Sequence, residues 1–455
     1  MIAIVGGGIS GLSAAWYLTQ AGHACTLVES RPCLGGVIST AAWEGCVIEG
    51  GPDSFLGAKP EATQLGRELG LDNDLVSSND ERRVTYIWRN GRLIALPDGM
   101  MMMVPTKTWP VVATPLLGWG TKIRMGLEYF RQPGGERPER SVAEFIGEHY
   151  GREAVDYLAE PLLSGVYGGD PRALSMNSVL PRFVEMERKY GSLTRGALEA
   201  RKRMTPGGAL FRTFRRGLGS LVEALEQRLG GVKVARAAAE AIERQGEGWR
   251  VRAGGEWVEA SHVVLAVPAY AAGSLLRPLD AELARLLETI DYSSSMTVTL
   301  AYRPGRLPFE PQGFGFLVPG KERRKVRALT HVQNKFPSRA PEGYTVMRCF
   351  LGGAGREAVL EETDEAVLRG VMRDLREMIG LHAAPDYQRI VRWPRAMAQY
   401  TLGHAYRVKR IEERVKGLRG IFLAGNAYSG IGIPDCIRTG RLAAEAISGG
   451  RNAIR

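Results

Sequence analysis

The chain has 455 residues, 44% of them hydrophobic and 24% charged, a composition typical of soluble globular proteins. Its length predicts two or three domains. Lys and Arg number 60 against 49 Asp and Glu, and the formal charge of +11 suits anionic ligands or an anionic membrane face. No zinc-finger spacing, RNA-binding aromatic signature or long basic helix accompanies this charge, so we expect no nucleic-acid partner.

The cysteines and histidines exclude several kinds of site. The five cysteines form no CxxC pair, and their odd number predicts a reduced, cytoplasmic environment. The six histidines show no metal-ligand spacing, so neither a metal site nor a nucleophile motif is predicted. No charged segment precedes the first apolar residues, and we expect neither a signal peptide nor a transit peptide.

A short apolar strand at residues 2–5 runs directly into a glycine loop, Gly6-x-Gly8-x-x-Gly11, and then into an apolar helix that ends near Gly22. In dinucleotide-binding domains the first glycine allows a tight turn and the second admits a pyrophosphate close to the backbone. The third lets the helix pack on the sheet. Free N–H groups at the start of the helix then face the phosphates. The pattern predicts a dinucleotide site.

A second strand at residues 25–28 ends at Glu29, 23 residues after Gly6. An acid in this place accepts hydrogen bonds from an adenosine ribose. The alternative is a glycine-rich turn in an ordinary βαβ unit, with Glu29 as a solvated strand end. The order of strand, loop, helix, strand and acid favours the dinucleotide site.

A second glycine pair, Gly35-Gly36, stands where a nicotinamide-binding domain would begin its next helix. The pair resembles the amine-oxidase-like FAD superfamily, in which an arginine usually follows it, whereas Val37 follows it here. This resemblance favours FAD over NAD. A glycine-proline turn at residues 49–55 can bring further backbone N–H groups to a ligand.

The stretch from Met100 to Trp119 is apolar, but Pro105, Lys107, Pro110 and Pro115 interrupt it before the ~20 apolar residues of a membrane span. We therefore expect no transmembrane helix. Methionines and tryptophans beside basic residues suit a membrane interface. A methionine-rich wall of an apolar substrate pocket is the alternative, and the two are compatible.

Residues 106–204 are expected to be mainly helical, with a capping box at Ser141 and Glu144. A β-meander ending in a buried strand is predicted at residues 232–234, 249–253, 256–259 and 262–266. A mixed or antiparallel sheet is predicted from residues 296–302, 315–318, 345–350 and 388–392, with a helix at 364–379 that Thr363 caps. A last strand at 420–425 runs into another glycine turn.

This last turn carries the most specific resemblance. Residues 424–440, AGNAYSGIGIPDCIRTG, resemble the closing flavin motif of protoporphyrinogen oxidases, oxygen-dependent flavoenzymes of haem biosynthesis that include bacterial coproporphyrinogen III oxidases. Residues 164–175, 313–319 and 392–404 agree with the same family, in the same order. The residues themselves also indicate a ligand site. A strand ends at Gly425-Asn426 and a helix begins at about Pro434, so the N-terminus of that helix would face a ligand, such as the electron-rich edge of a reduced flavin.

The resemblance implies an α/β fold: a Rossmann-like FAD-binding domain of the amine-oxidase superfamily type, a mixed-sheet substrate domain and a mainly helical insertion. We expect the FAD-binding domain to be discontinuous, from residues 1–80, 205–289 and 398–455. Residues 81–105 and 290–397 would form the substrate domain, and residues 106–204 a helical domain that contacts a membrane.

The resemblance also implies which residues contact FAD. They lie in the two glycine motifs, the glycine-proline turn, one later strand position, one tryptophan and the closing turn. These residues are Gly6, Gly8, Ile9, Ser10, Gly11, Glu29, Ser30, Gly35, Gly36, Gly51, Pro52, Asp53, Ser54, Val234, Trp393, Gly425, Asn426, Gly432, Ile433 and Pro434.

For the substrate, the resemblance implies an apolar cavity in which Leu317 packs on the macrocycle and Phe350 stacks on a pyrrole. Gly169 falls in the loop whose backbone carbonyl would accept from pyrrole N–H groups. Leu317 and Phe350 as ordinary core residues of their strands are the alternative.

The propionate contact departs from the family pattern. Many members place an arginine where this chain has Thr85, and a threonine cannot make the bidentate carboxylate contact of an arginine. Arg82, Arg83 or Arg89 are candidates to replace it. The basic run at residues 321–327 is a further candidate, although we interpret that run as a solvated surface face.

The resulting hypothesis is an FAD-dependent oxidation of protoporphyrinogen IX or coproporphyrinogen III to the porphyrin. Each of three cycles would transfer a hydride from a methylene bridge to the flavin and reduce O2 to hydrogen peroxide, with no catalytic protein side chain required. The alternatives are a flavin amine oxidase and a non-catalytic flavoprotein scaffold. We also expect a peripheral contact with the inner face of the cell membrane, and a homodimer or a haem-pathway enzyme as partner.

Overall fold

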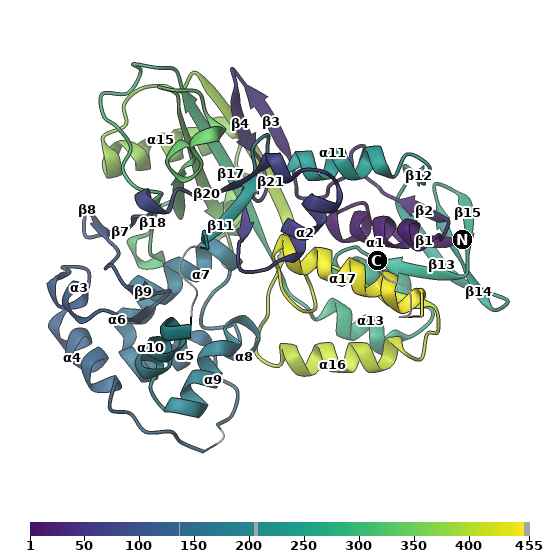
Figure 1. The fold of residues 1–455 in the computed structure, drawn as a ribbon, viewed down its shortest axis with the longest axis horizontal. Coiled ribbons are helices and arrows are strands. Elements are labelled where there is room, and N and C mark those ends of the chain that lie inside the picture. Colours follow the sequence, from purple (N-terminus) through teal and green to yellow (C-terminus); the bar gives the residue numbers. More distant parts are fainter. Residues whose placement is uncertain (136, 204–207, 450–455) are drawn as a thin grey trace.

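The computed structural model describes residues 1–135, 137–203 and 208–449. Figure 1 shows three lobes: a parallel sheet with its helices on the right, a mixed sheet at the upper left, and a group of helices at the lower left. We call them the parallel-sheet lobe, the mixed-sheet lobe and the helical lobe. The domain borders drawn from the sequence stay a prediction, and the border at residues 204 and 205 and the end at 450–455 lie outside the described residues.

The parallel-sheet lobe contains five strands that pair only in parallel, and most of their side chains are buried. The buried apolar runs reflect helices on both faces, as is typical of parallel sheets. The strand order is β12 (Lys233–Ala235), β2 (Cys25–Val28), β1 (Ile2–Val5), β16 (His262–Leu265) and β22 (Ile421–Leu423). The sheet is therefore assembled from three chain segments far apart in sequence.

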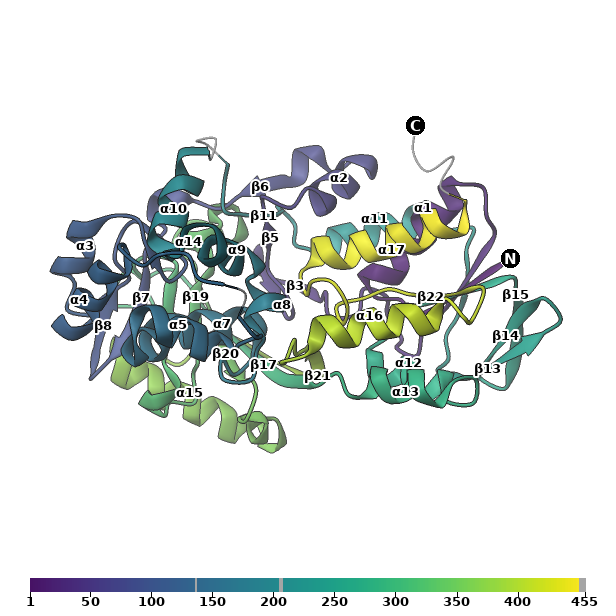
Figure 2. The same ribbon diagram turned by 90° about the horizontal axis from the view of Figure 1, so that it is seen from below.

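Alternate side chains of β1 divide the core of this lobe into two layers. Ile2 and Ile4 pack with α1 (Ile9–Gln20), α11 (Gly219–Arg228) and α17 (Ile433–Ile447). Ala3 and Val5 pack with α12 (Ala269–Leu276), α13 (Ala281–Glu288) and α16 (His404–Val415) on the other face. Figure 2 shows these two groups of helices on opposite sides of β22. The helix α2 (Glu61–Glu68) packs against α17.

The predicted β-meander is wrong in one respect. Three strands form a separate antiparallel sheet that projects from the lobe: β13 (Ala239–Gln245), β14 (Gly248–Ala253) and β15 (Glu256–Ala260). The strands at 233–235 and 262–265 instead join the parallel sheet, because both pair in parallel with the N-terminal strands. Apolar runs of this length indicate a strand without indicating its partner.

The mixed-sheet lobe contains the predicted strands of residues 296–302, 315–318, 345–350 and 388–392 in one sheet. Its pairs are antiparallel except β18 with β7. The order is β21 (Tyr387–Ala398), β17 (Tyr292–Tyr302), β20 (Thr345–Gly352), β19 (Ala328–His331), β18 (Gly315–Leu317), β7 (Thr85–Arg89) and β8 (Arg92–Ala95). The helix α15 (Asp364–Ile379), capped by Thr363 as predicted, covers one face. The short helix α14 (Val332–Lys335) follows β19.

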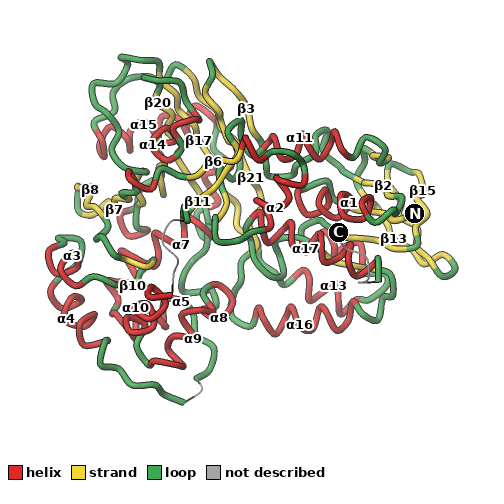
Figure 3. The backbone as a smooth tube through the Cα atoms, viewed as in Figure 1, coloured by secondary structure: helices red, strands yellow, loops and turns green. Residues whose placement is uncertain are grey.

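The described part of residues 106–204 is mainly helical, as predicted, and Ser141 and Glu144 form the expected capping box. Figure 3 shows these helices gathered below the strands of the mixed sheet. They are α3 (Thr108–Ala113), α4 (Trp119–Glu128), α5 (Val142–Tyr150), α6 (Arg152–Ala154), a π-helical turn (Val155–Ala159), α7 (Glu160–Tyr167), α8 (Met176–Val179), α9 (Pro181–Tyr190) and α10 (Leu193–Arg203).

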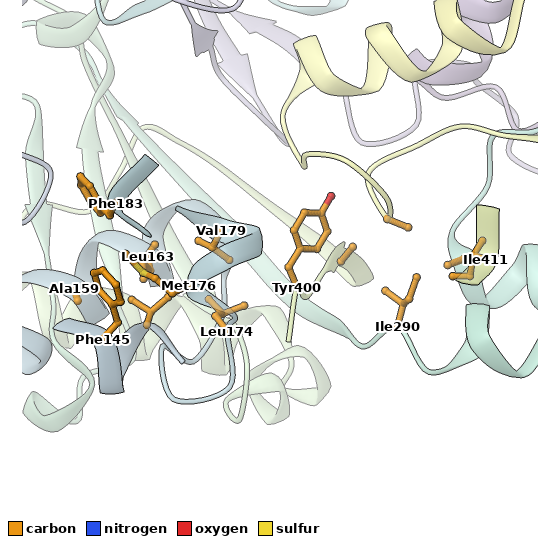
Figure 4. Packing of buried hydrophobic residues seen from close by; sticks show 14 of the residues in the cluster. Phe145, Ala159, Leu163, Leu174, Met176, Val179, Phe183, Ile290, Tyr400 and Ile411 are labelled. Carbon is orange, nitrogen blue, oxygen red and sulfur yellow. The ribbon is translucent and has the colours of Figure 1, made fainter. Parts of the chain in front are cut away.

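Short strands complete the fold. They form the hairpins β3 (Thr40–Trp43) with β4 (Cys46–Glu49) and β9 (Met100–Met101) with β10 (Val104–Pro105), and a sheet of β5 (Phe55–Leu56), β11 (Phe211–Phe214) and β6 (Leu75–Ser77). Tyr400 lies between the apolar side chains of the helical lobe, such as Phe145 and Val179, and those of Ile290 and Ile411 (Figure 4). One buried cluster thus joins the helical lobe to the parallel-sheet lobe.

Candidate functional site

The glycine loop between β1 and α1 adopts the backbone that the sequence predicts. Gly6 has a φ of +106°, and a Cβ there would lie 2.4 Å from the carbonyl oxygen of Ala266. A Cβ on Gly11 would lie 1.9 Å from the oxygen of Gly6. The space at Gly8 is different, because the nearest atom to a Cβ there would be the Cα of Gly36, at 3.9 Å. Gly6 and Gly11 therefore serve the protein's own packing, whereas the room beside Gly8 suits a ligand.

Glu29 closes β2 beside this loop, and it is buried. Its carboxylate accepts from the N–H of Gly7 at 2.6 Å, from the N–H of Arg31 at 2.7 Å and from the Ser30 hydroxyl at 3.3 Å. The N–H of Glu29 donates to the neighbouring strand β12, one residue after Val234. The structure thus brings Glu29, Ser30 and Val234 together at the carboxyl ends of parallel strands, where dinucleotides bind.

The second glycine pair lies against the first loop. The N–H of Gly35 donates to the carbonyl of Gly7 at 2.8 Å, and a Cβ on Gly36 would lie 3.0 Å from the Cα of Gly8. The guanidinium of Arg31 donates to the carbonyl of Gly36 at 2.7 Å and lies 5.7 Å from the centre of the Trp393 ring. An arginine therefore reaches the glycine pair from the residues before it, although Val37 follows it.

Side chains of the mixed sheet donate hydrogen bonds to the turn at Gly51–Ser54 and to Gly50, the residue before it. The carbonyl of Gly50 accepts from the Thr297 hydroxyl at 2.7 Å and from the Trp393 indole at 2.8 Å. The carbonyl of Gly51 accepts from Arg348. Within the described residues, no backbone partner is present for the N–H groups of Gly51, Asp53 and Ser54. A turn with its carbonyls fixed and its N–H groups free fits an anionic or carbonyl-bearing ligand.

A buried charge network fixes the same turn. The ammonium of Lys335 lies 3.1 Å from both carboxylate oxygens of Asp53 and 3.0 Å from the Ser54 hydroxyl. Arg348 lies 3.7 Å from the same carboxylate and is almost fully buried. Burial alone would raise the pKa of Asp53, but the charges of Lys335 and Arg348 outweigh burial and hold this pKa well below its usual range. Asp53 is therefore ionised at neutral pH.

The closing turn follows β22, and Gly425 has a φ of +133°. The Tyr400 hydroxyl donates to the carbonyl of Asn426 at 2.8 Å and accepts from the N–H of Gly430 at 2.7 Å. The helix α17 then begins at Ile433, directly after Gly432 and one residue before Pro434, so its N-terminus faces this turn. Tyr400 thus fixes the conformation between the strand and the helix.

A carboxylate shares the N-terminus of α17. Asp435 accepts from the N–H of Gly432 at 3.2 Å, and the ammonium of Lys59 lies 2.7 and 2.6 Å from its two oxygens. Arg438 contacts the same carboxylate at 3.1 Å. Arg438 also lies 3.9 Å from Glu61, so two cations and two carboxylates balance one another beside the helix end.

The predicted substrate residues lie in one row across the mixed sheet. Leu317 is in register with Ala328, Ala328 with Phe350, and Phe350 with Thr297. Residues in register project to the same face, and Leu317 and Phe350 are only partly buried, although Leu317 also packs against the large buried cluster of the helical lobe. Thr297 donates to Gly50, so the row runs up to the Gly51–Ser54 turn. Thr297 therefore links the row of predicted substrate residues to the predicted cofactor turn.

Gly169 follows α7 on the opposite side of this row. It is buried, and a Cβ there would lie 2.4 Å from the amide oxygen of Gln399. The preceding Gly168 accepts at its carbonyl from the N–H of Ala354, at 2.7 Å. A Cβ at Gly165 of α7 would lie 3.5 Å from the Leu317 side chain. The α7 segment therefore contacts the row at Leu317, and the residue after α7 contacts the turn that follows β20.

The structure removes one candidate for the propionate contact. Arg89 is already engaged, because its guanidinium lies 2.8 Å from Glu153, donates to the carbonyl of Leu116 and stacks on Tyr157. The interpretation of residues 321–327 as a solvated face is wrong at its last position, since Arg327 is buried. The sequence of a basic segment gives its charge, but the path of the backbone determines which of its side chains are buried.

Three residues of the site were missed from the sequence. They are Lys335 and Arg348, which fix the turn at Asp53, and Tyr400, which fixes the closing turn. Arg348 carries a signal that could have found it, because it is a single charge within an otherwise apolar buried strand. Tyr400 and Lys335 stand in segments without such a pattern.

The residues present fit FAD. The loop beside Gly8, the acid at Glu29 and the free N–H groups after Gly50 supply room, a ribose acceptor and hydrogen-bond donors. No helix in the described ranges is long and apolar enough to cross a membrane.

Residues 9–448 match the family of flavin-containing amine oxidoreductases. The chain belongs to this family, and it is an FAD-dependent oxidoreductase with the α/β fold predicted from its sequence. The expected superfamily, enzyme class and cofactor are thereby confirmed.

Particular relatives are more informative. The chain is 33% identical to coproporphyrinogen III oxidase of Bacillus subtilis (strain 168), over 97% of this chain and 96% of that protein. It is 30% identical to chloroplastic protoporphyrinogen oxidase of Nicotiana tabacum, over 98% and 85%. A crystal structure from Exiguobacterium sp. 255-15 matches with a TM-score of 0.89 and 33% identity over 99% of both chains. Cyclohexylamine oxidase of Brevibacterium oxydans, at 19% identity and a TM-score of 0.71, shares the fold.

Proposed function

We propose that this protein oxidises a porphyrinogen, coproporphyrinogen III or protoporphyrinogen IX, to the porphyrin with O2 as acceptor, as a step of haem biosynthesis. The observation that carries the proposal is the likeness, over nearly the full chain, to relatives named for these two activities. When bound, FAD supplies the two-electron redox chemistry. The protein's own residues then bind the cofactor, orient the substrate and exclude water.

The proposed cofactor contacts come from three segments, residues 1–80, 205–289 and 398–455, with Trp393 added from the mixed sheet. The proposed substrate cavity lies between the row of Leu317 and Phe350 and the loop at Gly169. Support comes from Thr297, which belongs to the row by register and donates to the cofactor turn at Gly50. A methylene bridge bound over this row would lie beside the flavin, and an apolar wall there would favour a neutral macrocycle.

Anaerobic mixing tests the function directly. We expect coproporphyrinogen III or protoporphyrinogen IX to bleach the flavin absorbance of the purified holoenzyme, and O2 to restore it with formation of hydrogen peroxide. Primary amines serve as the control substrates. Bleaching by amines alone would indicate an amine oxidase, and no bleaching by any of these compounds would indicate a flavoprotein scaffold; either result contradicts the proposal.

We also propose that α3 and α4 contact the cytoplasmic face of the membrane peripherally. Trp119, Ile123 and Leu127 recur at helical spacing on α4, and each is at least 60% exposed. Trp109 of α3 and Phe130 after α4 are more than 70% exposed. The two helices lie at the far end of the helical lobe, away from the parallel sheet (Figure 2). Exposed apolar area of this kind marks an interaction surface.

Basic residues border this surface. Lys122 and Arg124 lie on the same helix, and Lys122 also stacks on Trp119, with 4.7 Å between its ammonium and the ring centre. Lysines beside tryptophans suit the headgroup level of an anionic bilayer, where the ring enters the interface and the ammonium meets phosphate. A second copy of the chain, or another haem-pathway enzyme, is the alternative occupant.

Replacing Trp119 and Leu127 together by serine is expected to weaken binding to phosphatidylglycerol vesicles by at least roughly tenfold, because two exposed apolar side chains no longer enter the bilayer. Cosedimentation with vesicles measures this change. Trp257→Ser, which alters a partly exposed tryptophan on the projecting sheet, is the matched control and should bind as the wild type does. If the wild-type protein does not bind vesicles and instead forms a dimer through this face, the membrane proposal is contradicted.

A further inference from the structure

Two arginines lie beside one carboxylate near α7. Arg327 donates through Nη2 to Glu160, and only 8% of its side chain is exposed. Arg356 donates through Nη2 to the carbonyl of Gly320 at 2.7 Å. The N–H of Gly320 in turn donates to the second oxygen of Glu160, at 2.9 Å. Glu160 thus links the two arginines, because it accepts from Arg327 directly and from the N–H of Gly320, whose carbonyl accepts from Arg356.

Backbone hydrogen bonds attach Arg327 to the proposed substrate row. Its N–H donates to the carbonyl of Phe350 at 2.8 Å. Its carbonyl accepts, also at 2.8 Å, from the N–H of Val318, the residue after Leu317. Arg327 therefore directly precedes Ala328 of the row, and its backbone lies between β18 and β20.

Arg356 lies just after β20, in a turn that contacts the end of α7. It ends a glycine-rich turn in which the N–H of Ala354 donates to the carbonyl of Gly168 at 2.7 Å. The N–H of Arg356 itself donates to the carbonyl of Gly353 at 2.9 Å. The backbone of Arg327 is thus joined to Phe350, and Arg356 belongs to the turn that contacts Gly168, the residue before Gly169.

The local charge is unbalanced. Glu160 pairs with Arg327, whereas Arg356 contacts a carbonyl. Nη1 of Arg327 is buried and has no hydrogen-bond partner in the described part of the chain. Burial, and after it the positive charge of Arg327, lowers the pKa of Arg356. A buried guanidinium with an unpaired nitrogen, beside a second, partly buried cation and a single anion, is costly, and a second anion would remove that cost.

We propose that Arg327 and Arg356 form a carboxylate-binding subsite for a propionate side chain of the porphyrinogen, an inference that rests on the proposed function. Guanidinium groups bind carboxylates through charge-assisted hydrogen bonds, which Thr85 cannot supply. The two substrates differ at two ring positions, where coproporphyrinogen III has propionates and protoporphyrinogen IX has vinyl groups. Two propionates are common to both substrates, so the subsite selects coproporphyrinogen III by holding one of the two propionates that protoporphyrinogen IX lacks.

Arg356→Gln in the holoenzyme tests this subsite, because Arg356 is the less buried of the two. We expect kcat/KM for coproporphyrinogen III to fall by about tenfold or more, and that for protoporphyrinogen IX by less than about twofold, since one charge-assisted contact is lost. Flavin content and Tm should not change. Arg324→Gln, in the same basic run but paired with Glu377 of α15, is the matched control and should keep the wild-type preference.

Product binding gives a second readout. Wild-type protein should bind coproporphyrin III more tightly than its tetramethyl ester, as measured by fluorescence quenching, and Arg356→Gln should abolish that difference. Arg327→Lys keeps the buried charge but not the guanidinium fork, and it should reduce the same preference while the protein stays folded. Equal losses on both substrates, or an unchanged preference for acid over ester, would overturn the subsite.

The two proposals fail in different ways. If neither porphyrinogen bleaches the wild-type flavin, the proposed function is wrong and the subsite falls with it. If both bleach it and Arg356→Gln retains the wild-type substrate preference, the function stands and only the subsite is wrong.

Discussion

Replacing Gly8 by valine is expected to leave the fold intact and to abolish FAD binding. The backbone at Gly8 has a φ of −72°, which a valine adopts without strain, and a Cβ there meets only the Cα of Gly36, at 3.9 Å. The side chain would instead occupy the space that we assign to the pyrophosphate. Excluding the pyrophosphate from the backbone N–H groups of this loop would weaken FAD binding on the order of 100-fold or more.

Equilibrium titration of the apoprotein with FAD, followed by flavin fluorescence, measures this effect, and circular dichroism shows whether the fold remains. Gly231→Ala is the control, because a Cβ at Gly231 meets nothing within 4 Å and this residue lies away from the site. Gly11→Val should behave differently and lose the fold as well, since its Cβ would overlap the oxygen of Gly6. Normal FAD affinity in Gly8→Val would place the pyrophosphate elsewhere.

Replacing Lys335 by methionine is expected to lower the free energy of unfolding by about 3 kcal/mol or more, since it leaves the buried carboxylate of Asp53 with a single cation, Arg348. The loss should depend on pH. The pKa of Asp53 is lowered in the folded protein, so the ion pair stabilises the fold above the ordinary carboxyl pKa and ceases to do so as the pH falls through the lowered value. The difference between variant and wild type should therefore shrink in acid.

Urea unfolding, followed by tryptophan fluorescence at several pH values, measures this dependence. The double variant Lys335→Met with Asp53→Asn should regain part of the loss, because the uncompensated charge is removed together with its partner. A stability loss that is the same at every pH, or a double variant that is only additive, would show that Lys335 acts by packing alone.

Much of the architecture could be predicted from the sequence, because its signals are local. The glycine spacing after β1, the capping box at Ser141 and the cap at Thr363 each depend on a few adjacent residues, and each was confirmed. The partners of short apolar strands are not local. Residues 262–265 read equally well as the end of a meander or as a central parallel strand, and only tertiary packing decides.

In the candidate site, too, local sequence signals could be interpreted and long-range contacts could not. Glu29 and Gly35-Gly36 could be proposed from their sequence spacing, and the structure places both against the first glycine loop. Lys335 and Arg348 contact a turn that lies almost 300 residues earlier in the chain. The hydrophobic periodicity of a sequence does not predict contacts between such distant residues. The burial of Arg327 was mispredicted for a related reason, since the charge pattern of a run does not show where the chain turns inward.

The contact between α1 and α17 has a consequence for biosynthesis. A Cβ on Gly440 would lie 2.2 Å from the carbonyl oxygen of Ser10, so the two helices touch backbone to backbone at the glycine loop. The helix that completes the cofactor site is thus translated more than 400 residues after the loop it packs against. A nascent chain exposes an unfinished nucleotide fold throughout elongation, when such surfaces aggregate readily. Flavin incorporation is therefore expected to follow release from the ribosome.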